Sequence, residues 1–480
     1  MISKVVTEIR LVKAFFIAGL AALLGFIAAH IDVAGTMGLI ALPFVALYLI
    51  WVFNKPVRAL YTVLYTGFFA NGMIRYSTAP FGLSIDVFLL ITLIAALAKP
   101  QKGRSALLKN PFVYAIAVWT AFTVFEIINP EARSFAAWFY SVRGTALYMM
   151  QLIILTILLI DDKKGMLKFV NIWIFCSALA AVWGMKQLYL GVNHAEQMWL
   201  DAGAYKTHLL FGRLRVFSFY SDAGQFGAAM GHVLLICLIL SLGPVKRKFK
   251  LGYLALSVFF FWAMAVSGTR GALFVPLSGF MVYLFLTKNF KILSIGIAVV
   301  GILFGLLKFT NVGAGNYQVQ RMRSALDPND PSLQVRLDNQ KKFAAYLKSR
   351  PIGGGIGSAG SWGQRFSPGT FLAETPTDSW YVKIWAETGI VGLWIHLGMI
   401  ITIAVTGTVM IFRMKNDLHL RQISMALFSG YIGIAFASYS NQVIGQAPSG
   451  IVVFMSLGLI WLAYKWDKAA QLMDTNEIKQ

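Results

Sequence analysis

Long runs of apolar residues constrain this chain more than any other feature. About 20 consecutive apolar residues are enough for an α-helix to cross a bilayer, whereas a membrane-spanning β-strand needs only about 9–11. Only helices and closed barrels satisfy every backbone group in lipid, and these runs are too long for barrel strands. We therefore expect an all-α polytopic membrane protein with about 12–14 transmembrane helices. The runs lie near 11–30, 35–53, 59–74, 82–98, 111–128, 136–160, 167–190, 225–242, 251–267, 271–287, 290–308, 389–412, 422–440 and 448–464.

The charge content agrees with this fold class. Only 13% of the 480 residues are charged, against roughly 25% in soluble proteins. The formal net charge is nevertheless +22. Short cytoplasmic loops rich in Lys and Arg, which set membrane topology, explain such an excess, so we expect no nucleic-acid partner. Cys176 and Cys237 lie inside apolar runs, and we expect neither a disulfide framework nor a cysteine metal site.

The basic loops predict one topology. With the N-terminus in the cytoplasm, the alternation of spans places every compact basic loop on the cytoplasmic side. We expect both termini there, and a single domain over residues 1–480. Two long segments, 191–224 and 309–388, then face outward. The basic loops contain Lys55 and Arg58; Lys99, Lys102, Arg104 and Lys109; Lys163, Lys164 and Lys168; Lys246, Arg247, Lys248 and Lys250; Lys288 and Lys291; Arg413, Lys415 and Arg421; and Lys465 and Lys468.

Positive charge also occurs on the outward side, where topology does not require it. The stretch RMRSALDPNDPSLQVRLDNQKKFAAYLKSR (321–350) lies in the long segment 309–388, which we expect to be largely helical. An anionic ligand at the outer face explains such cations, because an Arg guanidinium fits phosphate oxygens bidentately. The alternatives are contact with lipid phosphates and pairing with nearby aspartates. The outward arginines that we take as candidate site residues are Arg213, Arg215, Arg270, Arg321, Arg323 and Arg336.

Sugars linked to a polyprenol diphosphate are the obvious phosphate-bearing substrates at this face. An acceptor hydroxyl attacks the anomeric carbon and the lipid diphosphate leaves, so catalysis needs cations at the leaving group and a base near the acceptor. No outward cluster of carboxylates or histidines suggests a metal, and DPND (327–330) is typical of a turn. We predict catalysis without a metal or another cofactor.

Three motifs around the long outward segment resemble those of one family. They are SGTRGAL (267–273), VRLDNQKKFAAYLKSRPIGGGIGSAG (335–360) and DSWYVKIWAETGIVGL (378–393). Their order and spacing resemble the O-antigen ligase and O-antigen polymerase superfamily of bacterial membrane glycosyltransferases. The resemblance implies a metal-independent enzyme of the GT-C class in the bacterial cytoplasmic membrane. It also implies an undecaprenyl-diphosphate-linked glycan donor, a glycan acceptor and an active site on the periplasmic face.

The resemblance also assigns residues. Two arginines characteristic of the family's motifs fall on Arg270 and Arg336, and Arg213 or Arg215 supplies a third. Asp378 falls where the family has a catalytic-type His, counting back from Glu387. Because this His is absent, the resemblance favours a surface-polysaccharide polymerase over a ligase. A transporter or flippase of lipid-linked sugars and a non-catalytic scaffold remain alternatives, and chain-length regulators or flippases are expected partners.

The remaining candidates have simpler explanations beside the functional one. Asp378 follows Pro-Thr at a predicted helix start, where an aspartate also serves as a helix cap. Arg143 lies about two turns inside its span, where charged side chains usually face a cavity, and Glu126 is a possible partner. Lys383 is four residues before Glu387 and has the spacing of a helical ion pair. We count Arg143 and Lys383 among the candidate substrate-binding residues.

Overall fold

The computed structural model describes residues 33–477 except 78, 100–102, 211, 312, 314, 316, 325, 326 and 328. Nearly all regular structure in these residues is helical. The described strands are β1 (Leu209–Leu210) and β2 (Arg213–Leu214), which form one short antiparallel pair. The predicted all-α fold is confirmed.

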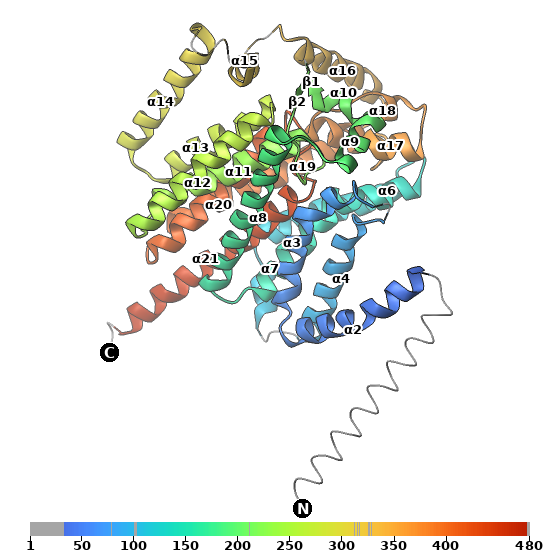
Figure 1. Ribbon diagram of the computed structural model, residues 1–480. Coiled ribbons are helices and arrows are strands. Elements are labelled where there is room, and N and C mark those ends of the chain that lie inside the picture. The colour runs from blue at the N-terminus through green and yellow to red at the C-terminus, as the bar shows by residue number, and fades with distance from the viewer. Residues whose placement is uncertain are drawn as a thin grey trace, which may run out of the picture.

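The chain runs back and forth through a bundle of long helices (Figure 1). The first part contains α2 (Val33–Asn54), α3 (Val57–Met73), α4 (Leu83–Ala98), η1 (Arg104–Leu108), α5 (Pro111–Phe125), η2 (Glu126–Ile128), α6 (Phe135–Val142), η3 (Arg143–Leu147), α7 (Tyr148–Leu159), α8 (Lys163–Tyr189), α9 (His194–Trp199), η4 (Leu200–Ala204) and α10 (Tyr205–His208). The second part contains α11 (Ala223–Ser241), α12 (Arg247–Val266), η5 (Arg270–Leu273), α13 (Phe274–Leu286), α14 (Phe290–Phe309), α15 (Tyr317–Ser324), α16 (Pro331–Leu347), α17 (Gly360–Phe366), α18 (Phe371–Glu374), α19 (Trp380–Arg413), α20 (Leu418–Ala437) and α21 (Ser449–Glu477).

Nine helical segments in the described residues are long and apolar enough to cross a bilayer, and two shorter apolar ones accompany them. The chain is therefore a polytopic helical membrane protein. Helices α3 and α14 coincide with two further apolar runs. The run near 11–30 lies outside the described residues. The nine segments are Gly35–Asn54, Pro111–Ile128, Phe135–Leu159, Lys163–Tyr189, Ala223–Ser241, Arg247–Val266, Trp380–Arg413, Leu418–Ala437 and Ser449–Gln471.

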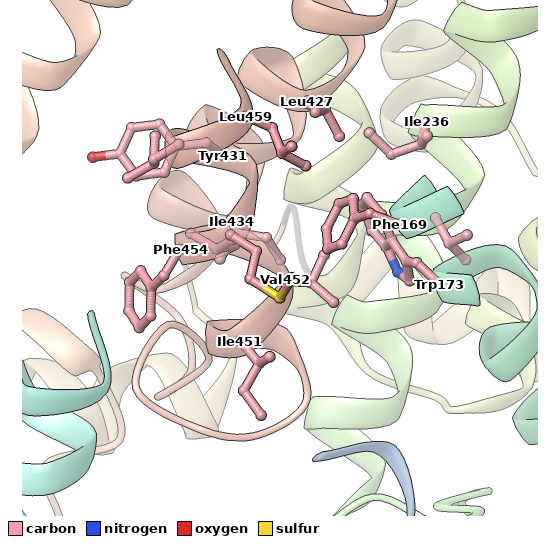
Figure 2. Close-up of a cluster of buried hydrophobic side chains, with 14 of the residues drawn as sticks. Phe169, Trp173, Ile236, Leu427, Tyr431, Ile434, Ile451, Val452, Phe454 and Leu459 are labelled. Carbon is pink, nitrogen blue, oxygen red and sulfur yellow. The ribbon is translucent and has the colours of Figure 1, made fainter. Parts of the chain in front are cut away.

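Helices α11, α20 and α21 form the centre of the bundle. More than four fifths of the apolar window of each is buried, against 6% for α2. A helix that is apolar on all sides is stable only when other helices or lipid surround it. Figure 2 shows side chains of α8, α11, α20 and α21 meeting in this core, with Phe169 and Trp173 facing residues of α20 and α21.

Small residues let two of these helices approach closely. A Cβ added at Gly279 of α13 would lie 2.7 Å from the carbonyl oxygen of Ser429 in α20, and one added at Gly433 of α20 would lie 2.5 Å from that of Val275 in α13. Lipid-embedded helices associate through close packing, since the surrounding tails are as apolar as their side chains. The reciprocal glycines therefore hold α13, and the η5 turn that precedes it, against the core.

The two long non-spanning segments gather at one end of the bundle (Figure 1). We call this the loop end and define it by the described residues of 191–222 and 309–379. Its largest element is α16, which the sequence predicted. The buried positions of α16 are Asn339, Phe343 and Leu347, spaced four apart. Leu333 and Val335, in the first part of the helix, are exposed.

The glycine-rich loop after α16 packs against α19. Residues 353–357 are buried, and the backbone N–H groups of Gly354 and Gly355 donate to the carbonyls of Ala386 (3.1 Å) and Glu387 (2.8 Å). Helix α19 breaks at Gly389, where φ is 65° and ψ is −166°, a combination that almost only glycine adopts. The break divides α19 into a short part at the loop end and a long apolar part in the bundle.

We predict that Gly389→Ala destabilises the protein by at least about 1–3 kcal/mol, the cost of a non-glycine residue in such a conformation. The added Cβ would also lie 2.0 Å from the carbonyl oxygen of Pro351. The matched control is Gly398→Ala in the same helix, where an added Cβ meets nothing within 4 Å. Thermal unfolding in detergent, followed by tryptophan fluorescence, checks this prediction. Equal unfolding temperatures for the two variants would contradict it.

Candidate functional site

A cleft of about 570 Å³ opens between the loop end and the bundle. Its lining brings together side chains from segments far apart in the sequence: the first long loop, the η5 turn, α15, α16, the start of α19 and the connection between α20 and α21. The lining contains five of the nine residues predicted from the sequence: Arg215, Arg270, Arg321, Arg336 and Asp378.

Arg270 lies in the η5 turn, beside the start of α16. Its guanidinium forms an ion pair with Asp330 and donates to Ser324 Oγ (3.3 Å). Asp330 also caps α16 by accepting from the backbone N–H of Leu333 (3.1 Å). Burial opposes ionisation of Asp330, but the hydrogen bond and charge of Arg270 outweigh it, so the pKa of this carboxyl lies below its ordinary value. The pairing with aspartate considered from the sequence therefore applies to Arg270.

Arg215 ties the first long loop to the turn before η5. Its guanidinium donates to the carbonyls of Thr207 (2.9 Å) and Ser267 (3.2 Å) and to Thr269 Oγ1 (2.9 Å). The Thr269 hydroxyl in turn donates to the carbonyl of Ala223 at the start of α11 (2.9 Å). Arg321 donates to the carbonyl of Gly268 in the same turn (3.4 Å). Two cations of the cleft thus hold its walls together as well as lining it.

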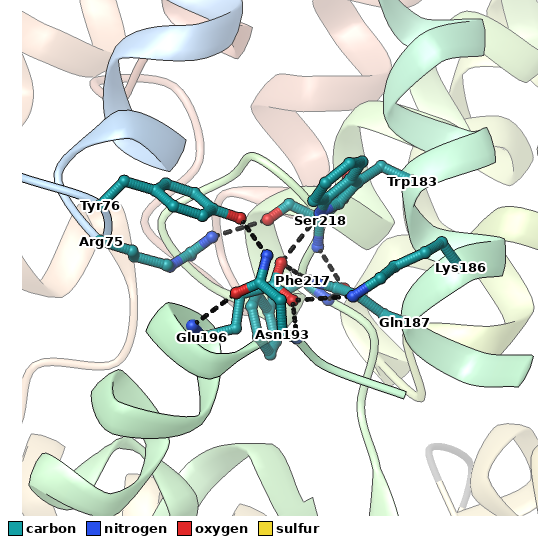
Figure 3. Close-up of polar contacts among 9 residues, drawn as sticks. All are labelled: Arg75, Tyr76, Trp183, Lys186, Gln187, Asn193, Glu196, Phe217 and Ser218. Atoms are coloured by element: carbon teal, nitrogen blue, oxygen red, sulfur yellow. Dashed lines mark hydrogen bonds and ion pairs between the residues drawn. The ribbon is translucent and has the colours of Figure 1, made fainter. Parts of the chain in front are cut away.

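A second network fixes the loop that carries Arg215 (Figure 3). Arg75, at the end of α3, lies between the rings of Trp199 and Phe217, 4.4 and 4.5 Å from their centroids. Its guanidinium donates to the carbonyl of Ser218 (2.6 Å). Nearby, the buried Glu196 accepts from Gln187 Nε2 (2.7 Å). A cation enclosed by aromatic rings and carbonyls resists displacement, so this part of the loop is rigid.

Arg336 differs from the other cations. It is half-buried in α16 and lines the cleft, yet among the described residues its guanidinium has no hydrogen-bond or ion-pair partner. A desolvated cation without a partner costs free energy unless an anion binds it. Its charge is therefore available to a ligand in the cleft.

Asp378 has an unusual backbone conformation. Its φ is 49°, a left-handed value that few non-glycine residues adopt and that Asp and Asn tolerate best. The N-cap of α19 is Ser379, with no side-chain cap hydrogen bond, so the helix-cap explanation for Asp378 is wrong. The α20–α21 connection holds the chain on both sides of it: Gln442 Nε2 donates to Thr377 Oγ1 (2.7 Å), and the N–H of Trp380, two residues after Asp378, donates to the Ser438 carbonyl (2.9 Å). The carboxylate is thereby held at the cleft wall.

Four predicted residues lie outside the cleft lining. Arg143 pairs with Asp86 (2.6 Å), not with Glu126, which accepts from Asn129 Nδ2 (2.7 Å). Lys383 is buried and forms its ion pair with Glu387 (2.8 Å), as its helical spacing indicated. The other two lie at the loop end: Arg213 is exposed on β2, and the Arg323 guanidinium donates to the carbonyl of Thr310.

One wall of the cleft was not predicted from the sequence. Tyr439, Ser440 and Asn441 line it from the connection between α20 and α21. The apolar run at 422–440 extends past the helix, because α20 ends at Ala437. The available signal was the polar run SYSNQ (438–442) between two apolar runs.

No group of three or more potential metal-ligating His, Cys, Asp or Glu side chains occurs in the part of the chain that the structure describes. Metal independence remains a prediction.

Comparison with known proteins confirms the resemblance seen in the sequence. Residues 255–397 match the family model described as O-antigen ligase. The matched stretch is therefore similar to an O-antigen ligase domain. It includes Arg270, Arg321, Arg336 and Asp378 of the cleft, whereas Arg215 and the 438–442 segment lie outside it.

Two relatives bear related names. An O-antigen polymerase of Salmonella muenchen is 29% identical over 193 residues, which are 39% of this chain and 45% of the relative. An O-antigen ligase of Salmonella typhimurium strain LT2 is 22% identical over 422 residues, which are 85% of this chain and 96% of the relative. The match to the polymerase thus spans less than half of that protein, while the match to the ligase extends well beyond residues 255–397.

Proposed function

We propose that this protein is a membrane glycosyltransferase of surface-polysaccharide assembly that uses an undecaprenyl-diphosphate-linked glycan as donor. The observation that carries the proposal is the cleft, in which four arginines and the Asp378 carboxylate, from distant segments, converge beside a membrane-spanning bundle. A diphosphate with a long lipid tail needs cations for its head and a bilayer for its tail. The names of the two relatives, an O-antigen polymerase and an O-antigen ligase, support this class of substrate.

The arginines act on the leaving group. Arg336 binds the diphosphate with its unpartnered guanidinium, and Arg270 contributes from the facing η5 turn. When the anomeric C–O bond breaks, its electron pair stays on the diphosphate oxygen, so negative charge grows where the cations lie. Cations held in place stabilise this charge without reorganising, which lowers the barrier.

Asp378 acts on the acceptor. Its carboxylate accepts a hydrogen bond from the acceptor hydroxyl and orients an oxygen lone pair toward the anomeric carbon. As the new C–O bond forms, the hydroxyl proton passes to the carboxylate. General-base assistance of this kind typically accelerates such steps by about 10²–10⁴-fold.

A polymerase is the first candidate and a ligase the second. Asp378 at the position of the family's His favours the polymerase, whereas the match over most of the chain to an O-antigen ligase favours the ligase. The decisive experiment incubates the purified protein with a lipid-linked repeat unit. A ladder of longer lipid-linked products supports the polymerase, and transfer only to a separate acceptor supports the ligase. If the lipid-linked repeat unit is not consumed and no undecaprenyl diphosphate is released, the proposal is wrong.

We place the cleft on the periplasmic side of the bacterial cytoplasmic membrane, because the basic loops then face the cytoplasm. Ala345→Cys in α16 and Lys248→Cys in the first turn of α12 introduce cysteines at exposed positions, while Cys176 and Cys237 are buried. We predict that a membrane-impermeant thiol reagent labels position 345 in intact spheroplasts, and position 248 only after lysis. The reverse pattern would place the cleft in the cytoplasm.

For Arg336 we predict that the Ala variant loses about 10- to 150-fold in transfer rate, corresponding to a lost charge-assisted contact of about 1.5–3 kcal/mol. Arg336→Lys restores only part of the rate, because an ammonium group lacks the planar fork. The control, Lys342→Ala, removes an exposed cation from the same helix and keeps the wild-type rate. Similar rates for Arg336→Ala and Lys342→Ala would exclude Arg336 from the site.

For Asp378 we predict that the Asn variant folds normally and loses about 10²-fold or more in rate. Asn adopts the left-handed conformation readily, so the change removes the base and leaves the backbone intact. Asp378→His restores a base and recovers part of the rate. Asp338→Asn, at an exposed carboxylate of α16 outside the cleft lining, is the matched control. Wild-type rates for Asp378→Asn would show that the base lies elsewhere.

A further inference from the structure

The walls of the cleft differ in chemistry. Its arginines come from the first long loop, η5, α15 and α16, whereas the connection between α20 and α21 contributes the neutral polar residues Tyr439, Ser440 and Asn441. Cations suit a diphosphate. Neutral amides and hydroxyls suit sugar hydroxyls, which need both donors and acceptors.

The neutral wall adjoins both ends of the proposed reaction site. A Cβ added at Gly271, the residue after Arg270, would lie 2.1 Å from Ser440 Oγ and 2.8 Å from Asn441 Nδ2. On the other side, the Nε2 of Gln442, the residue after Asn441, donates to the Oγ1 of Thr377, the residue before Asp378 (2.7 Å). Arg270, Asp378 and this wall line the same cleft. A sugar whose diphosphate sits at Arg270 and whose anomeric carbon faces Asp378 would therefore lie beside this wall.

One side chain of the wall stands out. The Ser440 hydroxyl donates to the carbonyl of Ala437 (2.9 Å), and the Gln442 amide donates to Thr377. The Asn441 amide is half-buried and lines the cleft, but within the described residues no group donates to it or accepts from it. It presents one acceptor and two donors to whatever occupies the cleft.

The backbone that carries this amide is fixed. Gln225 Nε2, from α11, donates to the carbonyls of Gln442 (2.9 Å) and Val443 (3.3 Å). The Ser449 hydroxyl donates to Gln225 Oε1 (3.2 Å) on the other side. An amide on a rigid backbone loses little conformational freedom when it binds, which favours selective recognition.

We infer that Asn441 recognises the diphosphate-linked sugar of the donor through hydroxyl or acetamido groups of that ring. This inference rests on the proposed function and extends it. The arginines bind the diphosphate, which every lipid-linked glycan of this class shares, and Asn441 binds the sugar, which differs from one glycan to another. Asn441 is a specificity-determining residue, and it takes no part in proton transfer.

The test separates the two parts of the donor. Binding to the purified protein in nanodiscs is measured for undecaprenyl diphosphate and for the same lipid carrying one hexose or one N-acetylhexosamine. The wild-type protein binds one of the sugar-bearing lipids more tightly than the bare lipid. Asn441→Ala and the near-isosteric Asn441→Leu lose this preference, with about a tenfold decrease for the sugar-bearing lipid. Both leave binding of the bare lipid within about twofold.

Three results would overturn the inference. The wild-type protein could show no preference for either sugar, or the Asn441 variants could keep the preference. The variants could also weaken binding of the bare and the sugar-bearing lipid equally, which indicates a purely structural role. Arg336→Ala tests the proposed function separately, because we expect it to weaken binding of the bare lipid and of the sugar-bearing lipid alike. If Arg336→Ala leaves binding of the bare lipid unchanged, the proposed function fails, whatever the Asn441 variants show.

Discussion

Lipid offers no hydrogen-bond partner to a peptide group, and this constraint organises the whole molecule. The chain therefore crosses the bilayer as helices, and its irregular backbone collects at helix ends or packs against protein. Three parts of the proposed site lie at such places: the η5 turn before α13, the left-handed residue before α19 and the connection after α20. The bundle supplies rigidity, and the helix ends supply the groups that can bind and react.

Arginine has two uses in this structure, and the described contacts tell them apart. The guanidinium groups of Arg75 and Arg215 donate hydrogen bonds to backbone carbonyls and hold loops in place. Arg270 is paired with the carboxylate that caps α16. Arg336 faces the cleft without a partner among the described residues. Since a guanidinium satisfied by the protein gains less from a new anion, we expect Arg336 to contribute most to phosphate affinity.

The sequence predicted what depends on local pattern. Apolar runs predicted the spans, the motifs around Arg270, Arg336 and Asp378 contain eight of the 23 residues that line the cleft, and helical spacing predicted the Lys383–Glu387 pair. Contacts between distant segments leave no such pattern. The partner of Arg143 is 57 residues away in sequence, and that of Arg270 is 60 residues away. Asn441 was missed for the same reason, because only the fold brings the connection between α20 and α21 beside η5.

The neutral wall of the cleft lies outside residues 255–397, which match the O-antigen ligase model and carry most of the cleft's charge. On the inference drawn for Asn441, chemistry and substrate choice are encoded in separate stretches of the chain. We then expect mutations in the 438–442 segment to change which glycan is accepted while the groups proposed for diphosphate departure stay intact. Such a division would let one enzyme scaffold follow the diversification of surface sugars through a few codons.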